Sequence, residues 1–138
     1  MSNELGPEER ERRAQLVART RTIIMQALDV KAVDADVLHL SYCDFYIQVA
    51  FSLAHPLMAF VLIRPLSRSV TVEDYKTINE LNLESVLGSH SVDAGGNCFF
   101  YRTAHWLETE LTAARLLEIL NRCVDEANRA YRKLVDGE

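Results

Sequence analysis

The chain of 138 residues is 49% hydrophobic and 25% charged, which is typical of one ordinary globular domain. Its net charge of −5 and pI near 5.4 oppose a general affinity for nucleic acid, which depends on clustered Lys and Arg. The longest apolar run, from Leu57 to Ile63, is far shorter than the roughly 20 residues that a membrane-spanning helix needs. We therefore expect neither a nucleic-acid partner nor a membrane partner.

Three cysteines, Cys43, Cys98 and Cys123, are odd in number, far apart and in no CxxC arrangement. This pattern argues against a secreted disulfide scaffold and against a zinc site. Since the sequence also has no basic and apolar leader pattern, we expect a cytoplasmic protein without a cofactor. The expected organisation is a flexible tail over residues 1–6 and a single domain over residues 7–138.

The first predicted element is a helix that begins at Pro7, with Glu8 and Glu9 in its positively polarised first turn. Its apolar residues recur at spacings of three and four: Leu16, Val17, Thr20, Ile23, Ile24, Ala27 and Leu28. We favour packing of this stripe on the chain's own sheet over a detachable partner-binding helix. An extended segment around Lys31–Val33 follows, and the alternation over Val37–Tyr42 predicts the first sheet strand.

The stretch from Asp44 to Leu66 predicts two strands joined by a turn at residues 54–56. The first strand alternates apolar and polar residues, as expected when one face is buried. The second contains the apolar run Leu57–Ile63, which is typical of a central strand covered on both faces. Because the chain's own helices are expected on only one face, the other face is the expected meeting place of a partner subunit or client.

Residues 71–74 resemble a capping box, which predicts a short helix to about Leu81 with Asn82 as its stop. Glycines in residues 94–97 predict a hairpin between strands Ser89–Asp93 and Cys98–Trp106 by supplying positive φ angles. Thr112 is the expected N-cap of a last helix that ends near Val135. Its predicted apolar stripe consists of Leu116, Leu120, Cys123, Val124, Ala127, Tyr131 and Leu134. The order α-β-β-β-α-β-β-α predicts an α+β fold whose antiparallel sheet is covered by helices on one face.

Few residues of the sequence are candidates for catalysis, metal binding or ligand binding. The four histidines fall in separate elements and lack a metal-binding spacing, so we expect no metal site and no catalytic residues. A candidate polar site consists of charged or titratable side chains on predicted strands: Arg64, Arg102, His39 and His105. For each of these, a structural role with a hydrogen bond or ion pair is favoured over ligand binding.

The candidate partner surface is apolar. It comprises residues of the central strand and of the aromatic segment in the last strand: Leu57, Ala59, Val61, Ile63, Trp106 and Phe99. Aromatic residues at strand spacing usually belong to a core, but an exposed Trp with a neighbouring Phe marks an interface.

With this element order and the segment Ile78-Asn79-Glu80-Leu81-Asn82, the chain resembles the bacterial YbjN-like family, which shares the fold of type III secretion chaperones. The resemblance spans roughly Val17–Leu134 and includes the glycine-containing hairpin, Tyr101-Arg102 and Ala127-Asn128. It implies a compact α+β domain that dimerises and binds other polypeptides, with no enzymatic residues to carry over.

These observations lead to the hypothesis of a non-enzymatic homodimer that binds protein or peptide clients, with a chaperone-like or regulatory role. Its apolar helical stripes and central strand need more covering surface than one layer provides. Two alternatives remain open. One is an enzyme or small-ligand protein with a pocket at the sheet formed by the candidate polar site, and the other is a structural subunit of a larger complex.

Overall fold

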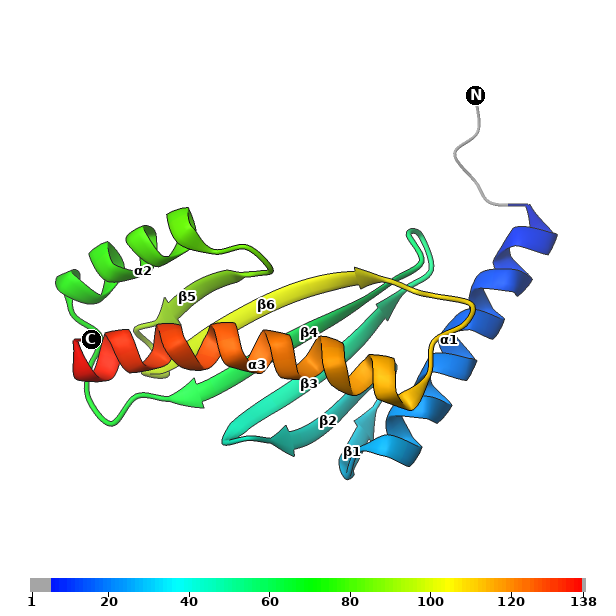
Figure 1. The fold of residues 1–138 in the computed structure, drawn as a ribbon, viewed down its shortest axis with the longest axis horizontal. Coiled ribbons are helices and arrows are strands. Elements are labelled where there is room, and N and C mark those ends of the chain that lie inside the picture. Colours follow the sequence, from blue (N-terminus) through cyan, green and yellow to red (C-terminus); the bar gives the residue numbers. More distant parts are fainter. Residues whose placement is uncertain (1–5, 138) are drawn as a thin grey trace.

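The structure is a computed structural model that describes residues 6–137. The tail expected over residues 1–6 lies outside this range except for Gly6, which is the N-cap of the first helix. Within the described range the elements follow one another as α1 (Pro7–Ala27), β1 (Val30–Asp34), β2 (Val37–Tyr42), β3 (Phe45–Ser52), β4 (Leu57–Pro65), α2 (Val72–Glu84), β5 (Ser89–Asp93), β6 (Cys98–Trp106) and α3 (Ala113–Asp136) (Figure 1).

The strands form one antiparallel sheet in the order β1-β2-β3-β4-β6-β5. The predicted α+β fold with an antiparallel sheet is confirmed. The sheet has one strand more than the predicted element order, because the extended segment around Lys31–Val33 pairs with β2 as an edge strand. The register of this pair shifts between Val30 and Ala32, an irregularity that is common at sheet edges.

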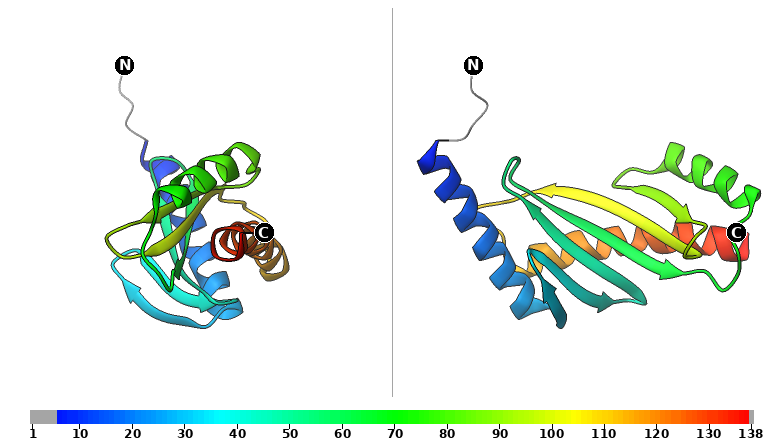
Figure 2. Two further views of the ribbon diagram at one scale, coloured as in Figure 1. Left: turned by 90° about the vertical axis from the view of Figure 1, so that its left-hand side faces the viewer. Right: turned by 180° about the vertical axis from the view of Figure 1, so that it is seen from behind.

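One face of the sheet is covered by helices. α3 runs along this face, and α1 packs against α3 (Figures 1 and 2). The strands turn alternate side chains toward the helices, as the burial patterns of β3 and β4 show. The buried apolar strand residues on this side are Leu38, Leu40, Phe45, Ile47, Val49, Met58, Phe60, Leu62, Phe99 and Tyr101.

The helices complete this core with the stripes that their sequences predicted. In α1, Leu16, Thr20 and Ile24 are buried. The buried Thr20 hydroxyl donates a hydrogen bond to the backbone carbonyl of Leu16 at 2.7 Å. The buried residues of α3 are Leu116, Ile119, Leu120, Cys123, Val124, Ala127, Ala130 and Leu134. The α1 stripe therefore packs within its own chain, as favoured from the sequence.

The N-terminus of α2 has the predicted capping box. Thr71 Oγ1 accepts a hydrogen bond from the backbone N–H of Asp74 at 3.3 Å, and Asp74 Oδ2 accepts one from the N–H of Thr71 at 2.8 Å. Arg68 binds the same carboxylate through hydrogen bonds of 2.6 and 2.8 Å. Arg68 and the Thr71 donors lower the pKa of Asp74 to about 2, against the opposing effect of burial.

The C-terminal part of α2 holds the edge strand β5. The helix continues to Glu84, beyond the end expected at Leu81. Asn82, expected as a helix stop, instead donates from Nδ2 to the carbonyl of His90 at 3.0 Å and accepts from the His90 N–H at 2.7 Å. The amide side chain thereby replaces a neighbouring strand at this edge of the sheet.

The hairpin between β5 and β6 has the predicted strand bounds but a different turn geometry. Its positive φ of 50° is at Asn97, and neither Gly95 nor Gly96 has a positive φ. The prediction that glycines supply the left-handed conformation is therefore wrong. Asn tolerates this conformation better than most residues with a side chain, and Asp93 Oδ1 supports the turn by accepting from the Gly95 N–H at 3.0 Å.

The loop between α2 and β5 is anchored to α3 by one carboxylate. Glu126 accepts hydrogen bonds from the Ser85 hydroxyl at 2.9 Å, from the backbone N–H groups of residues 86–88 at 3.0 to 3.2 Å, and from the Tyr101 hydroxyl at 2.7 Å. Burial opposes ionisation, but the Tyr101 hydroxyl and the other donors outweigh it and lower the pKa of Glu126 to about 2.

Gly88 allows this loop to approach β6 closely. A Cβ at this position would lie 2.4 Å from the carbonyl oxygen of Arg102 and 2.6 Å from Cγ2 of Thr103. The absence of a side chain at Gly88 therefore has a packing role.

Candidate protein-binding surface

The face of the sheet opposite α1 and α3 is here called the open face. Its rows follow from strand register, since Tyr46 pairs with Ile63, Ala50 with Ala59, and Leu57 with Trp106. Side chains of β3, β4 and β6 that alternate with core residues therefore lie next to one another. The apolar members of the open face are Tyr46, Ala50, Leu57, Ala59, Val61, Ile63, Phe100, Ala104 and Trp106.

No helix within residues 6–137 covers the open face, and the burial of its residues follows from this. Residues of β4 such as Val61 and Ile63 are half-buried by their strand neighbours alone. Larger side chains toward the margins reach further into solvent, with Trp106 64% exposed and Tyr46 42% exposed. Exposed apolar side chains grouped along an uncovered strand in this way are typical of an interaction site.

A row of polar side chains crosses the open face between its apolar rows. His39 on β2 stacks on Tyr46 with 5.7 Å between ring centroids, and its Nδ1 hydrogen-bonds to the Tyr46 hydroxyl. Gln48 and Arg102 lie on either side of Val61 in the strand register. The open face therefore has an apolar track along β4, with one polar row that crosses the sheet at Val61.

The candidate partner residues are placed as follows. Leu57, Ala59, Val61, Ile63 and Trp106 all lie on the open face. Phe99 does not, because it is fully buried on the helix-covered side. Its inclusion in the candidate surface is therefore corrected, and the next residue of β6, Phe100, takes that place.

The four candidate polar residues lie on opposite sides of the sheet. His39 and Arg102 are on the open face, whereas Arg64 and His105 share the helix side with the core residues of β4 and β6. The Arg64 guanidinium lies 4.1 Å from the ring centroid of Tyr131. These groups do not converge on one pocket, so the candidate polar site is not assembled in this structure.

One contact on the helix side was missed from the sequence. His105 Nε2 lies 2.9 Å from Thr103 Oγ1 and 3.6 Å from Cys123 Sγ. Burial lowers the pKa of His105, an effect that nearby Arg115 reinforces, and burial raises the pKa of the Cys123 thiol. Since Cys123 is fully buried and its thiol is held neutral, this pair lacks the accessible thiolate that a nucleophile needs.

A second exposed apolar group, here called the α2 patch, lies at the other end of the molecule from α1 (Figure 2). Leu83 is 81% exposed and Val86, just beyond the helix, is 86% exposed. The patch consists of Val72, Tyr75, Leu83, Val86 and Leu87. Its three helical members share one side of α2 through spacings of three and eight residues.

Two further features of the described residues bear on function. Residues 6–137 contain no group of three or more His, Cys, Asp or Glu side chains that could hold a metal ion. Among the helices in this range, none combines the length and the apolar character needed to cross a membrane.

The fold and its uncovered sheet face define a class: the chain has a YbjN-like fold, which is also the fold of type III secretion chaperones. The crystal structure of YbjN from E. coli superposes with a TM-score of 0.63, covering 87% of this chain and 89% of YbjN at 8% sequence identity. A chain of the HopA1-SchA chaperone-effector complex superposes with a TM-score of 0.56, covering 91% of this chain and 96% of that chain at 10% identity. No protein-family model matches the sequence, and no curated protein sequence does.

Proposed function

We propose that this protein is a non-enzymatic, chaperone-like binding protein that holds a segment of a client polypeptide on its open face. The observation that carries this proposal is the apolar track of β4 on the open face, which no helix of the described chain covers although β4 has the apolar run of a doubly covered strand. The structural similarity to a chain of a chaperone-effector complex supports a protein client.

The shape of the open face suits an extended client segment. The half-buried β4 residues Leu57, Ala59, Val61 and Ile63 form a continuous apolar track along the strand. Trp106, which pairs with Leu57, offers a large aromatic anchor at one end of this track. Aromatic anchors of this kind carry a disproportionate share of the binding energy at protein interfaces. A non-enzymatic role is supported by the separation of the candidate polar residues and by the neutral, buried state of the Cys123 thiol.

We also propose that the protein is a cytoplasmic homodimer whose subunits meet through the α2 patch. Side chains such as Leu83 and Val86 are almost fully exposed, and a second copy of the same patch would remove them from water. This arrangement leaves the open face of each subunit free for a client, because α2 lies beside β5 rather than over β4.

Client binding is tested by site-specific photo-crosslinking in native cells, with the photoreactive amino acid at position 104 on the open face and at position 118 on α3 as the control. We expect a discrete adduct from position 104 that Val61→Glu abolishes, since a charge at the centre of an apolar interface is costly to bury. Equal adducts from both positions, or an adduct that survives Val61→Glu, would refute binding at the open face.

Dimerisation is tested separately by light scattering at low micromolar concentration. The wild type is expected to have the mass of two chains, and Leu83→Glu the mass of one. Met25→Glu is the matched control, because Met25 is 51% exposed on α1 and lies outside the α2 patch. A monomeric wild type contradicts the dimer, and a dimeric Leu83→Glu variant contradicts the interface.

A further inference from the structure

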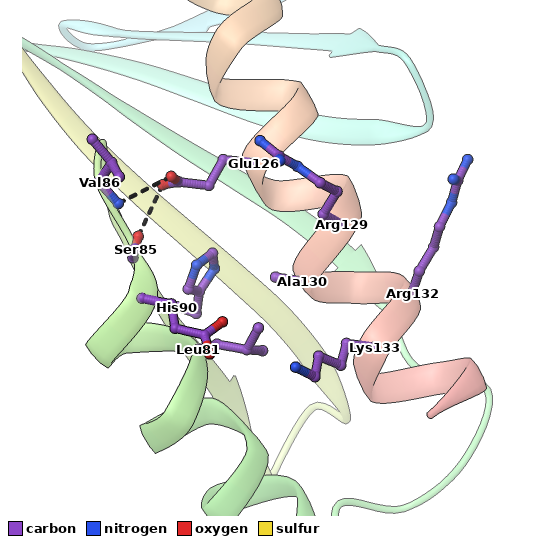
Figure 3. A pocket seen from close by; sticks show the side chains of 10 residues that line it. Leu81, Ser85, Val86, His90, Glu126, Arg129, Ala130, Arg132 and Lys133 are labelled. Atoms are coloured by element: carbon purple, nitrogen blue, oxygen red, sulfur yellow. Dashed lines mark hydrogen bonds between the residues drawn. The ribbon is translucent and has the colours of Figure 1, made fainter. Parts of the chain in front are cut away.

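A cavity of about 420 Å³ lies on the helix side of the molecule, between the end of α2, the start of β5 and the C-terminal half of α3 (Figure 3). Its apolar floor includes Leu81 and Ala130, and its walls carry His90, Glu84, Arg129 and Lys133. This volume lies within the range of small-molecule sites, which combine an apolar lining with a few polar groups.

The first observation that points to a ligand in the cavity is an unpaired ring nitrogen of His90. Its side chain is only 4% exposed, and its Nδ1 has no hydrogen-bond partner among residues 6–137. Burial lowers the pKa of His90, against the opposing charge of Glu126, so the ring is held in its neutral form. A buried polar atom without a partner is rare and costs free energy unless something else satisfies it.

The imidazole ring of His90 is placed so that a ligand in the cavity could hydrogen-bond to its Nδ1. Phe99 stacks on His90 with 5.9 Å between ring centroids and an interplanar angle of 22°, and Tyr101 packs against His90 in a tilted arrangement at 5.0 Å and 37°. A half-turn of the imidazole about its Cβ–Cγ bond keeps the ring in the same plane and exchanges the positions of Nδ1 and Cδ2. Figure 3 shows the ring between the Glu126 carboxylate and Leu81, on the wall of the cavity.

The charges around the cavity indicate what kind of ligand it would take. Arg129 lies one turn before Arg132 and Lys133 on α3, and none of the three forms an ion pair within 4.0 Å among the described residues. Glu126 does not neutralise them by direct contact, because its oxygens are occupied by the loop and Tyr101. Glu84 is the one acidic side chain of the lining whose oxygens are not so occupied in the described structure.

The side chains of Arg129 and Lys133 extend in other directions from α3 than the side chain of Arg132 (Figure 3). In Figure 3, Lys133 extends toward Leu81 across the cavity, and Arg129 lies close to Glu126, whereas Arg132 extends away from both. The lining carries three cations against the two carboxylates of Glu84 and Glu126, a net charge of +1 in a chain whose net charge is −5. Because Arg129 and Lys133 have no ion-pair partner among the described residues, they are free to bind an anion at this place.

We propose that this cavity binds a small organic anion. Its carboxylate or phosphate group would accept hydrogen bonds from Arg129 and Lys133, its apolar part would lie on Leu81 and Ala130, and it would supply the missing partner of His90. The proposal does not depend on client binding, because the cavity lies on the helix side and the client surface is the opposite face of the sheet.

The test is isothermal titration of the full-length protein with phenyl phosphate and phenylacetate, which combine a ring with either anionic group. Inorganic phosphate and 2-phenylethanol serve as probes that have only the charge or only the ring. We expect saturable binding of at least one of the two ring-containing anions and at least tenfold weaker binding of both partial probes. Absence of saturable binding of both anions at millimolar concentration overturns the proposal, as does equal binding of inorganic phosphate, which indicates charge attraction alone.

Variants locate the site. Arg129→Gln and Lys133→Gln should each weaken binding about tenfold, as expected for loss of one charge-assisted hydrogen bond at a partly solvated site. Arg122→Gln is the matched control on α3, because Arg122 pairs with Glu118 at 2.7 Å and does not line the cavity. An equal loss in the Arg122→Gln variant would refute the assignment.

A spectroscopic readout tests the role of His90 directly. On saturation with the ring-containing anion, the imidazole nitrogen resonances of His90 should shift, whereas those of the distant His39 and His55 should not. Unchanged His90 resonances at saturation would show that the anion binds elsewhere.

Discussion

The carboxylate of Glu126 is expected to be the main link between α3 and the loop that leads into β5. We consider Glu126→Gln, which preserves shape but replaces one acceptor oxygen by an NH₂ group. The carboxylate accepts from Ser85, from residues 86–88 and from Tyr101. The amide has too few acceptor positions for these donors, so at least one of them would remain buried without a partner.

The size of the effect follows from the pKa of Glu126, which is lowered from its ordinary value of 4.5 to about 2. At neutral pH such a shift corresponds to about 3 kcal/mol of folding free energy, and partial solvation of the side chain reduces this to about 2 kcal/mol. Because the folded-state pKa is the lower one, this stabilisation is fully present above pH 4.5 and is lost as the pH falls toward 2.

Urea unfolding followed by circular dichroism at pH 7 and at pH 3 measures both quantities. Glu126→Gln should be less stable than the wild type by about 2 kcal/mol at pH 7, and by less than half of that at pH 3. The control is Glu118→Gln, an exposed α3 residue that pairs with Arg122 and should cost at most about 1 kcal/mol. Equal costs for the two variants at pH 7, or a Glu126→Gln deficit that does not depend on pH, would refute the reasoning.

Three further predictions concern the same end of the fold. Gly88→Ala should lower stability by at least about 2 kcal/mol, because the new Cβ would lie 2.4 Å from the backbone oxygen of Arg102, and an unchanged thermal midpoint would contradict this. Asp74→Asn should cost about 1 to 2 kcal/mol in urea unfolding above pH 4, since it weakens both the helix cap and the ion pair with Arg68, and the cost should shrink as the pH falls toward 2. Asn82→Ala should accelerate amide hydrogen exchange in β5 by about tenfold through loss of its two hydrogen bonds to the strand, while exchange in β3 remains as in the wild type.

The parts of the fold that could be predicted were those encoded by local patterns. The alternation in residues 45–52 and the turn residues after Asp93 gave the bounds of strands, and Thr71 with Asp74 gave the start of α2. The apolar stripe of α3 predicted which side of that helix faces the core. These signals are readable because each depends on residues that are close in sequence.

The parts that could not be predicted depend on contacts between distant residues. Glu126 has the sequence context of a solvent-facing helix residue, and only the position of the loop 38 to 41 residues earlier gives it hydrogen-bond partners. Phe99 and Phe100 are adjacent aromatics, and which one faces the core depends on how β6 pairs with β4. The separation of Arg64 from Arg102 by the sheet has the same origin, since a shift of β6 by one residue against β4 would place Arg102 on the same face as Arg64.

The two lateral edges of the sheet differ, and this difference limits how molecules can join edge to edge. At β5 the backbone groups of His90 are already bonded to the Asn82 side chain, whereas at β1 no such clamp is present within the described residues. Continuous fibre growth by strand pairing requires two open edges on every molecule. Pairing through β1 alone would end with two molecules, so the Asn82 amide opposes continuous polymerisation by occupying the backbone groups of His90 at the second edge.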